Sequence, residues 1–195
     1  MEFKEIKPEE MSKRLVRHGD LVPRTKLEGS TNTLPLEVTK PFGASVNYSY
    51  MAPAMENNSY ITRFAAITGG DAGNAISLSM AICQPGEGPY MHMHMHTDET
   101  FLVLYGKFAI IWGEHGEHRV EVGQYDLISV PAGVLRTFEN IGDEPAALFV
   151  VIQGDKKEFN DVSFTPALAE SIAEKYGEDT LAQLKANGRN FTAGV

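Results

Sequence analysis

The stretch "GEGPYMHMHMHTDETFLVLYG", residues 86–106, places a histidine at every second position three times and follows the last with two carboxylates. Side chains alternate between the two faces of a β-strand. A strand over residues 90–96 therefore puts three methionines on one face and three imidazoles on the other, namely His92, His94 and His96. Clustered imidazoles repel one another when protonated, so this face indicates either a bound metal that keeps them neutral or a solvated edge.

The spacing in this stretch resembles the first motif of the cupin superfamily, which runs Gly, five residues, His-x-His, three or four residues, Glu, six residues, Gly. The positions that meet the pattern are Gly86, His92, His94, Glu99 and Gly106. The resemblance implies that His92, His94 and Glu99 are metal ligands, because pairing His94 with the next histidine leaves only two residues before Glu99. His96 is then an additional ligand or a proton carrier.

The second cupin motif runs Gly, five residues, Pro-x-Gly, two residues, His, three residues, Asn. The segment "YDLISVPAGVLRTFEN" supplies Pro131, Gly133 and Asn140 at this spacing. It has Tyr125 at the first glycine position and Arg136 at the position of the last metal-binding histidine. An arginine stays protonated and has no lone pair to donate, so it cannot replace that ligand.

Arg136 leaves three arrangements open. In the first, His92, His94 and Glu99 hold a divalent ion as two histidines and one carboxylate, and His96 joins them only if the strand bends. In the second, no metal binds and Glu99 pairs with Arg136, as in metal-free sugar isomerases of the cupin type. In the third, the ion is present and Arg136 faces the mouth of the site, where it clamps a substrate carboxylate or enolate.

Nine short β-rich runs, separated by Gly or Pro, follow one another from Tyr60 to Ile152. Their close spacing leaves no room for helical crossovers, so the sequence predicts an all-β fold, an antiparallel double-stranded β-helix of the jelly-roll or cupin barrel type. Upstream, "ASVNYSYM" (44–51) is a candidate strand and "PEEMSKRLVRHG" (8–19) a candidate helix. Downstream, "TPALAESIAEKYG" and "EDTLAQLKANG" predict a helical hairpin, because threonine, proline and glycine stand where helices begin and end.

Three regions follow from these patterns. Residues 1–59 form an N-terminal helix and irregular arm that packs on the barrel, residues 60–160 form the cupin barrel, and residues 161–195 form the helical hairpin. Within the barrel, alternation from Glu99 and from Arg136 predicts an apolar substrate pocket, although barrel packing is the better explanation for each of these aromatic residues singly. Trp112 ends the run "KFAIIWG", where a place at the mouth and a place in the core are equally good interpretations. The predicted lining is Arg136, Phe101, Tyr105, Phe138 and Trp112.

The composition bears on partners and location. A net charge of −9, with 17 basic and 26 acidic residues, argues against nucleic acid and anionic membranes and favours a small-molecule substrate. The lone Cys83 and an N-terminus without a signal peptide or span indicate a cytoplasmic protein. The methionine face formed by Met91, Met93 and Met95 needs a cover, which predicts a homodimer with the N-terminal arm exchanged or packed along the outer sheet.

Together, the residues and the resemblance predict a metal-dependent enzyme, most simply a dioxygenase, acting on a small oxygenated molecule that is anionic and aromatic or diketone-like. Fe(II) is the expected metal, with Mn, Ni or Zn as alternatives. Arg136 would stabilise the anionic substrate, and His96 would act as a base or proton relay. The alternatives are a lyase or isomerase that uses Glu99, His96 and Arg136, and a small-molecule-binding protein without catalysis.

Overall fold

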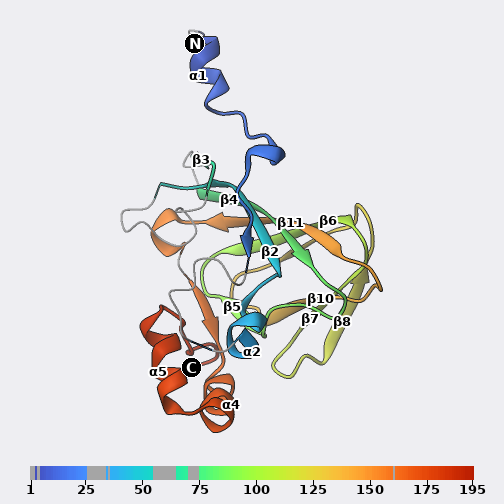
Figure 1. The fold of residues 1–195 in the computed structure, drawn as a ribbon, viewed down its shortest axis with the longest axis vertical. Coiled ribbons are helices and arrows are strands. Elements are labelled where there is room, and N and C mark those ends of the chain that lie inside the picture. The colour runs from blue at the N-terminus through green and yellow to red at the C-terminus, as the bar shows by residue number, and fades with distance from the viewer. Residues whose placement is uncertain are drawn as a thin grey trace.

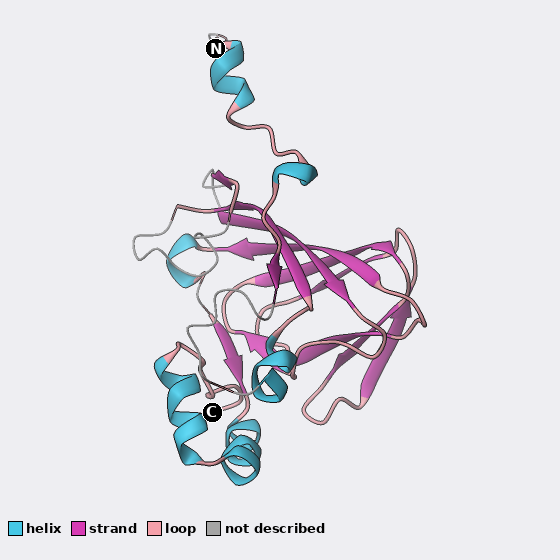
Figure 2. Ribbon diagram, in the orientation of Figure 1, coloured by secondary structure: helices cyan, strands magenta, loops and turns pink. Residues whose placement is uncertain are grey.

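A computed structural model describes residues 3, 5–25, 34, 36–54, 65–69, 75–159 and 161–195. Its body consists of two β-sheets, with a pair of helices at the C-terminal end (Figures 1 and 2). Within the described ranges, the paired strands are antiparallel except β2 with β3, which are parallel. The predicted mainly β fold and the C-terminal helical hairpin are both confirmed.

The larger sheet has seven strands in the order β1-β2-β4-β11-β6-β9, with β3 beside β2. Its longest pairing joins β4 to β11 over nine residue pairs. The strand bounds are β1 Arg24–Thr25, β2 Val46–Ala52, β3 Ile67–Thr68, β4 Ala75–Cys83, β6 Asp98–Tyr105, β9 Leu127–Val130 and β11 Ala146–Gly154. Strand β2 confirms the candidate strand at 44–51.

The smaller sheet has five strands in the order β12-β5-β10-β7-β8. It brings β5, which carries two of the three histidines, between β10 and the late strand β12. The bounds are β5 His92–His94, β7 Phe108–Trp112, β8 His118–Val122, β10 Arg136–Asn140 and β12 Val162–Phe164.

The main hydrophobic core lies between the two sheets. On β6, residues Glu99, Phe101 and Val103 alternate inward, as the period of two requires, and are 6%, 1% and 0% exposed. Phe108 of β7 and Phe138 of β10 meet them from the other sheet. The Glu99 carboxylate therefore points into the interior between the sheets, where it needs a partner.

The C-terminal helices α4 (Pro166–Tyr176) and α5 (Glu178–Ala186) form a second hydrophobic cluster with Phe164 of β12. Helix α4 begins at a threonine cap, because the Thr165 side chain accepts a hydrogen bond from the Leu168 amide. It ends at Gly177, whose φ of 92° suits glycine. The short helices are α2 Leu36–Thr39, η2 Lys40–Phe42 and η3 Lys156–Glu158.

The N-terminal helix is shorter than predicted. Helix α1 covers Pro8–Ser12, and η1 (His18–Asp20) follows as a separate turn. None of the residues of α1 is buried, and the helix projects from the body of the molecule (Figure 1). A helix without a packed face gains little from tertiary contacts, which is why the amphipathic pattern does not extend it to Gly19.

The predicted boundary between the arm and the barrel falls within residues 55–64, outside the described residues. Among the described residues, the helices are all too short or too polar to cross a bilayer. Met91, Met93 and Met95 are half-buried, and the predicted homodimer stays a prediction.

Candidate metal centre

Four charged or titratable side chains meet inside the barrel from three strands. His92 and His94 lie on β5, Arg136 lies on β10 directly opposite His92, and Glu99 comes from β6 of the facing sheet. Their exposed fractions are 7%, 3%, 0% and 6%. The structure therefore brings together the residues that the two motifs supply.

The two histidines and Glu99 fit a divalent metal. One donor atom from each of them lies within 4.8 Å of the others. Atoms bound to one ion at about 2.0–2.2 Å are at most about 4.4 Å apart, so small side-chain shifts bring all three onto it. Imidazole nitrogens and a carboxylate oxygen are donors that suit iron, manganese, nickel and zinc.

Each imidazole has one nitrogen already hydrogen-bonded. Nδ1 of His92 lies 2.8 Å from the carbonyl oxygen of Tyr90, so Nδ1 donates and Nε2 keeps the lone pair. Nδ1 of His94 lies 2.9 Å from Thr97 Oγ1 and 3.1 Å from Asp161 Oδ1. Such partners orient metal-binding histidines.

Arg136 is turned to Glu99. Its Nη2 and Nε lie 2.7 and 3.2 Å from the same oxygen, Oε2, of Glu99. None of its surface is exposed, so the arrangement in which Arg136 faces the mouth of the site is not the one seen. Burial raises the pKa of Glu99, but the neighbouring His94 and Arg136 lower it by more. The pKa of Glu99 therefore lies below its ordinary value, and the carboxylate stays ionised.

His96 does not join this group, and the expectation that it shares the face of His92 and His94 is wrong. Strand β5 ends at His94, and the backbone bends at the next two residues. The side chain of His96 is 55% exposed and lies 3.7 Å from Glu158. The cause is Asp161, whose carboxylate accepts the amide of His96 at 2.9 Å and so draws that amide out of the sheet ladder.

Of the predicted pocket aromatics, two face inward. Phe101 and Phe138 are buried in the main core, and their rings meet edge to face with centroids 5.3 Å apart. Both side chains therefore fill the barrel interior. Tyr105 is 41% exposed, contrary to prediction. Between the pairs Leu148–Val103 and Ala147–Tyr105, β6 advances by two residues and β11 by one, and this bulge breaks the inward alternation. Trp112 is half-buried beside His118, with ring centroids 5.6 Å apart.

Asp161 and Thr97 belong to the site, and neither was predicted from the sequence. Asp161 precedes β12, and its carboxylate contacts His94 from 67 residues away in the chain. Burial raises the pKa of Asp161, but the hydrogen bonds from His94, His96 and Thr97 lower it by more, so that the pKa is about 2. No motif spacing marks such a residue, because its place depends on β12 pairing with β5.

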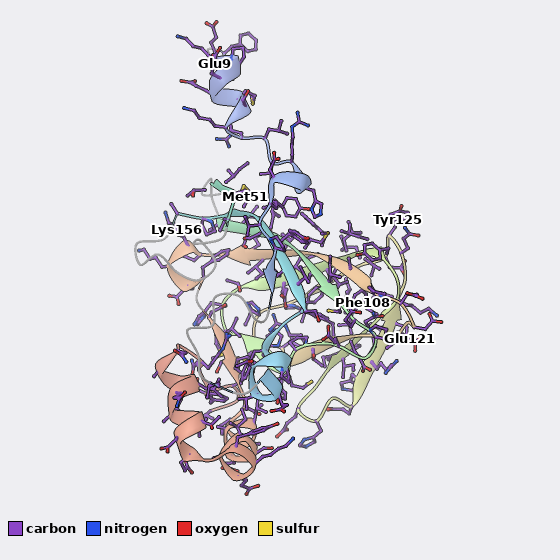
Figure 3. The ribbon with its side chains drawn as sticks, viewed as in Figure 1. Glu9, Met51, Phe108, Glu121, Tyr125 and Lys156 are labelled. Carbon is purple, nitrogen blue, oxygen red and sulfur yellow. The ribbon has the colours of Figure 1, made fainter. Side chains whose placement is uncertain are left out.

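Tyr125 stands at the glycine position of the second motif and has the left-handed backbone conformation that glycine adopts easily. Its φ of 69° lies in the left-handed region, and its amide donates to the carbonyl of Val103 at 2.8 Å. The ring is 74% exposed at the edge of the barrel (Figure 3). The motif geometry therefore survives this departure from the pattern.

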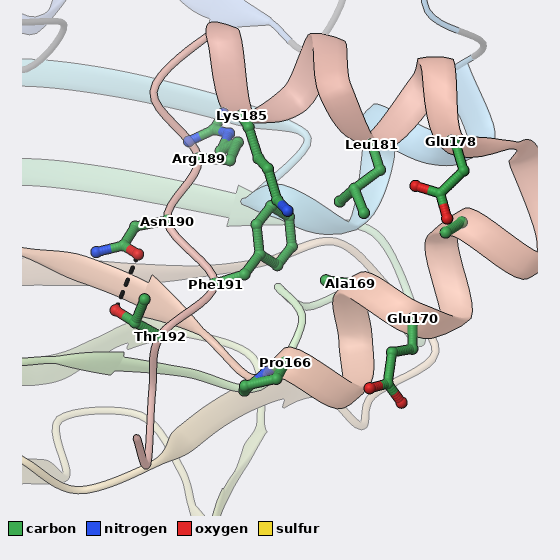
Figure 4. Close-up of a pocket in the computed structure, with 11 residues that line it drawn as sticks. Pro166, Ala169, Glu170, Glu178, Leu181, Lys185, Arg189, Asn190, Phe191 and Thr192 are labelled. Atoms are coloured by element: carbon green, nitrogen blue, oxygen red, sulfur yellow. Dashed lines mark hydrogen bonds between the residues drawn. The ribbon is translucent and has the colours of Figure 1, made fainter.

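A separate groove of about 470 Å³ lies between α4, α5 and the C-terminal segment (Figure 4). Leu181 and Phe191 are among its apolar lining residues, and Lys185 and Glu178 are among its charged ones. None of the predicted site residues lines this groove, so it is distinct from the metal centre.

The neutral form of His92 makes the fold sensitive to acid. Burial, reinforced by the charge of Arg136, lowers the pKa of His92 to about 3. In the unfolded chain His92 takes up a proton near pH 6.5, whereas in the folded protein it does so only near pH 3. The contribution of neutral His92 to stability is therefore fully present above pH 6.5 and is lost as the pH falls toward 3. We expect the free energy of unfolding of the metal-free protein, measured with urea, to fall by about 2 kcal/mol from about pH 7 to about pH 5.

The substitution His92→Gln should flatten this part of the pH profile, because glutamine does not titrate. His118→Gln is the matched control, since the His118 side chain is 58% exposed. An unchanged slope in His92→Gln would show that another group causes the loss.

The comparisons with known proteins agree with the motif and the fold. Residues 79–152 match the family described as "Cupin domain". Mannose-1-phosphate guanylyltransferase ManC of Salmonella typhimurium is 32% identical over 92 residues, which are 47% of this chain and 18% of that enzyme. The chain thus spans less than a fifth of this curated relative.

Solved structures with a similar fold include two cupin domains. The Cupin 2 conserved barrel domain protein of Salinispora arenicola shares 20% identity at a TM-score of 0.38, over 45% of this chain and 68% of that chain. The Cnp3 cupin domain of Schizosaccharomyces pombe shares 16% identity at a TM-score of 0.41, over 57% and 67%. Residues 79–152 of the chain thus match the cupin domain family.

Proposed function

We propose that the chain is a metal-dependent cupin enzyme that acts as a dioxygenase on a small, oxygenated, anionic molecule of aromatic or diketone type. The observation that carries the proposal is the buried group of His92, His94 and Glu99, in which both imidazoles are oriented by hydrogen bonds. Two histidines and one carboxylate with open positions are the donor set of non-haem iron oxygenases. Fe(II) is therefore the proposed metal, and Mn, Ni and Zn are the alternatives.

The charges around the centre favour an anionic substrate. A divalent ion and Arg136 bring three positive charges, while Glu99 and Asp161 bring two negative ones, which leaves a charge near +1. A monoanion such as an enolate or a phenolate offsets that charge. When bound, the ion supplies polarisation of a substrate oxygen, which lowers the pKa of the attached hydroxyl or enol.

The side chains of the centre have separate roles in this proposal. Nε2 of His92 and Nε2 of His94 would hold the ion, because the Nδ1 atoms are already hydrogen-bonded, and Glu99 would supply a carboxylate oxygen. Arg136 holds that carboxylate ionised and in place through its two hydrogen bonds. His96 has no role in this reaction, because its exposed side chain lies beside Glu158, outside the group.

The buried pair of Glu99 and Arg136 favours a second candidate, a lyase or isomerase. Oε2 of Glu99 lies 3.7 Å from Nε2 of His94, so either atom is placed to move a proton between two positions of one substrate. Such a reaction consumes no oxygen. A cupin that only binds its ligand would neither consume oxygen nor change the ligand.

Metal analysis of protein purified without a histidine tag tests the proposal. We expect about one ion per chain, mainly iron when the protein is purified under reducing, anaerobic conditions. His92→Ala and His94→Ala should each lower the content to about a tenth or less, since two remaining donors hold an ion poorly. His96→Ala is the matched control and should keep the metal, because the His96 side chain is 55% exposed.

Metal content that is unchanged in His92→Ala and His94→Ala would contradict the proposed centre. Oxygen uptake with catechols, β-diketones and 2-oxo acids then separates the candidate reactions. Uptake that depends on His92 supports the dioxygenase. Conversion of a substrate without uptake supports the lyase or isomerase.

A further inference from the structure

We propose that Asp161 is a positioning residue of this centre, which fixes the tautomer of His94 so that Nε2 keeps its lone pair for the metal. The inference rests on the proposed function, because it assigns a role toward the same site. Asp161 lies beyond residues 79–152, the part of the chain that matches the cupin domain. The role therefore belongs to a segment that the two motifs do not include.

The Asp161 carboxylate is surrounded by donors. Its side chain is 1% exposed. Oδ2 accepts the amides of His96 and Thr97 at 2.9 and 2.7 Å and the Thr97 hydroxyl at 2.9 Å. Oδ1 lies 3.1 Å from Nδ1 of His94. An ionised carboxylate only accepts hydrogen bonds, so Nδ1 must be the donor in this contact.

The second neighbour of the His94 ring leads to the same conclusion. Thr97 Oγ1 lies 2.9 Å from Nδ1 of His94. The hydrogen of this hydroxyl is used toward Asp161, so only its lone pairs remain for the imidazole. Two acceptors thus face Nδ1, which carries the proton, and the neutral ring has its lone pair on Nε2. That atom lies 3.7 Å from Oε2 of Glu99, inside the centre.

Strand β12 holds Asp161 in place. Val162 and Phe164 pair with His94 and His92, and the Asp161 carbonyl accepts the amide of Met95 at 3.2 Å. The strand is tied in turn to the C-terminal segment, where Phe164 exchanges hydrogen bonds of 2.8 and 2.9 Å with the backbone of Asn190 and Ala193. The helical end of the chain is therefore connected to the orientation of one metal ligand.

The substitution Asp161→Asn reverses the hydrogen-bond pattern without a change of shape. The two backbone amides at Oδ2 demand an acceptor, so the asparagine turns its carbonyl oxygen to them. Its NH2 group then faces Nδ1 of His94, which has to accept. The proton moves to Nε2, and the nitrogen that faces the centre loses its lone pair.

Two measurements test this inference. Long-range 1H–15N NMR of the histidine rings in metal-free protein, at about pH 8, should show a protonated Nδ1 on His94 in the wild type and a protonated Nε2 in Asp161→Asn. The affinity for Co(II) or Zn(II), measured by competition with a chromophoric chelator, should fall about 10–100-fold in the variant, as is usual when such a partner is lost. Asp155→Asn is the matched control, because Asp155 also accepts a backbone amide, that of Lys157 at 2.9 Å, but has no contact with the ring.

A His94 ring protonated only at Nε2 in the wild type would overturn the inference whether or not any variant folds. It is also overturned if Asp161→Asn folds and keeps both the wild-type tautomer and the wild-type affinity. Thr97→Val should keep the protonated Nδ1, since the carboxylate remains, and a reversed tautomer there would assign the role to the hydroxyl instead. If the wild type binds no metal, the proposed function fails, while the ring spectra still decide the role of Asp161.

Discussion

Replacing Glu99 by glutamine is expected to lower the free energy of unfolding of the metal-free protein by about 3–5 kcal/mol. Arg136 is completely buried, and its two shortest hydrogen bonds, at 2.7 and 3.2 Å, both end on one oxygen of Glu99. The carbonyls of His92 and Val134 lie 3.5 Å from Nη1 and compensate little. A neutral amide at position 99 therefore leaves a positive charge in the core without a counter-charge.

Urea denaturation, monitored by tryptophan fluorescence and circular dichroism, measures this loss. Adding Arg136→Met to Glu99→Gln should restore most of the stability, because the methionine fills the space without a charge to compensate. Glu158→Gln is the matched control and should cost about 0–1 kcal/mol, since the partly exposed pair of Glu158 and His96 is screened by solvent. A Glu99→Gln protein within about 1 kcal/mol of the wild type would show that Arg136 reaches water or another acceptor.

Replacing Arg136 by histidine is expected to tighten divalent metal binding by roughly 100-fold. The substitution removes a positive charge next to Glu99. A unit charge about 5 Å from a divalent ion repels it by about 7 kcal/mol at an effective dielectric constant of 20, and the Glu99 carboxylate between them offsets more than half of this repulsion. It also places an imidazole opposite His92 on the neighbouring strand. The same variant should be less stable than the wild type without metal, because Glu99 loses its counter-charge, and metal should more than restore it.

Competition titration with Zn(II) or Co(II), together with melting curves with and without metal, checks this result. Arg136→Met separates the two causes, since it removes the charge and adds no ligand. The difference in metal affinity between Arg136→His and Arg136→Met is then the contribution of the new imidazole alone. Binding to Arg136→His that is no tighter than to the wild type would place Arg136 away from the ion.

The sequence predicted the candidate metal-binding residues better than the residues around them. The spacing to Glu99 identified His92 and His94 because a motif on one strand and the next is local in the chain. The pairing of Arg136 with Glu99 was one of three open arrangements, since spacing shows that two residues are close but not how a long side chain turns. His96 was misplaced because the residue that bends its backbone, Asp161, is 65 residues away.

The fold shows the same division between local and distant causes. Short alternating runs predicted the two sheets, and Thr165 and Gly177 marked the ends of α4 because caps are set by neighbouring residues. The amphipathic pattern of residues 8–19 overstated the N-terminal helix, since a periodic face forms a long helix only where something packs on it. The exposure of Tyr105 follows from a bulge that no alternation pattern reveals.

The position of β12 also has a consequence for the order in which the protein is made. Synthesis from the N-terminus completes His92, His94, Glu99 and Arg136 well before residues 162–164, which supply β12. Until then β5 is the outermost strand of its sheet, with unpaired amides and carbonyls along one side that another chain can pair with. A nascent chain thus carries His92 and His94 on an open strand edge until residues 162–164 are made and pair with it.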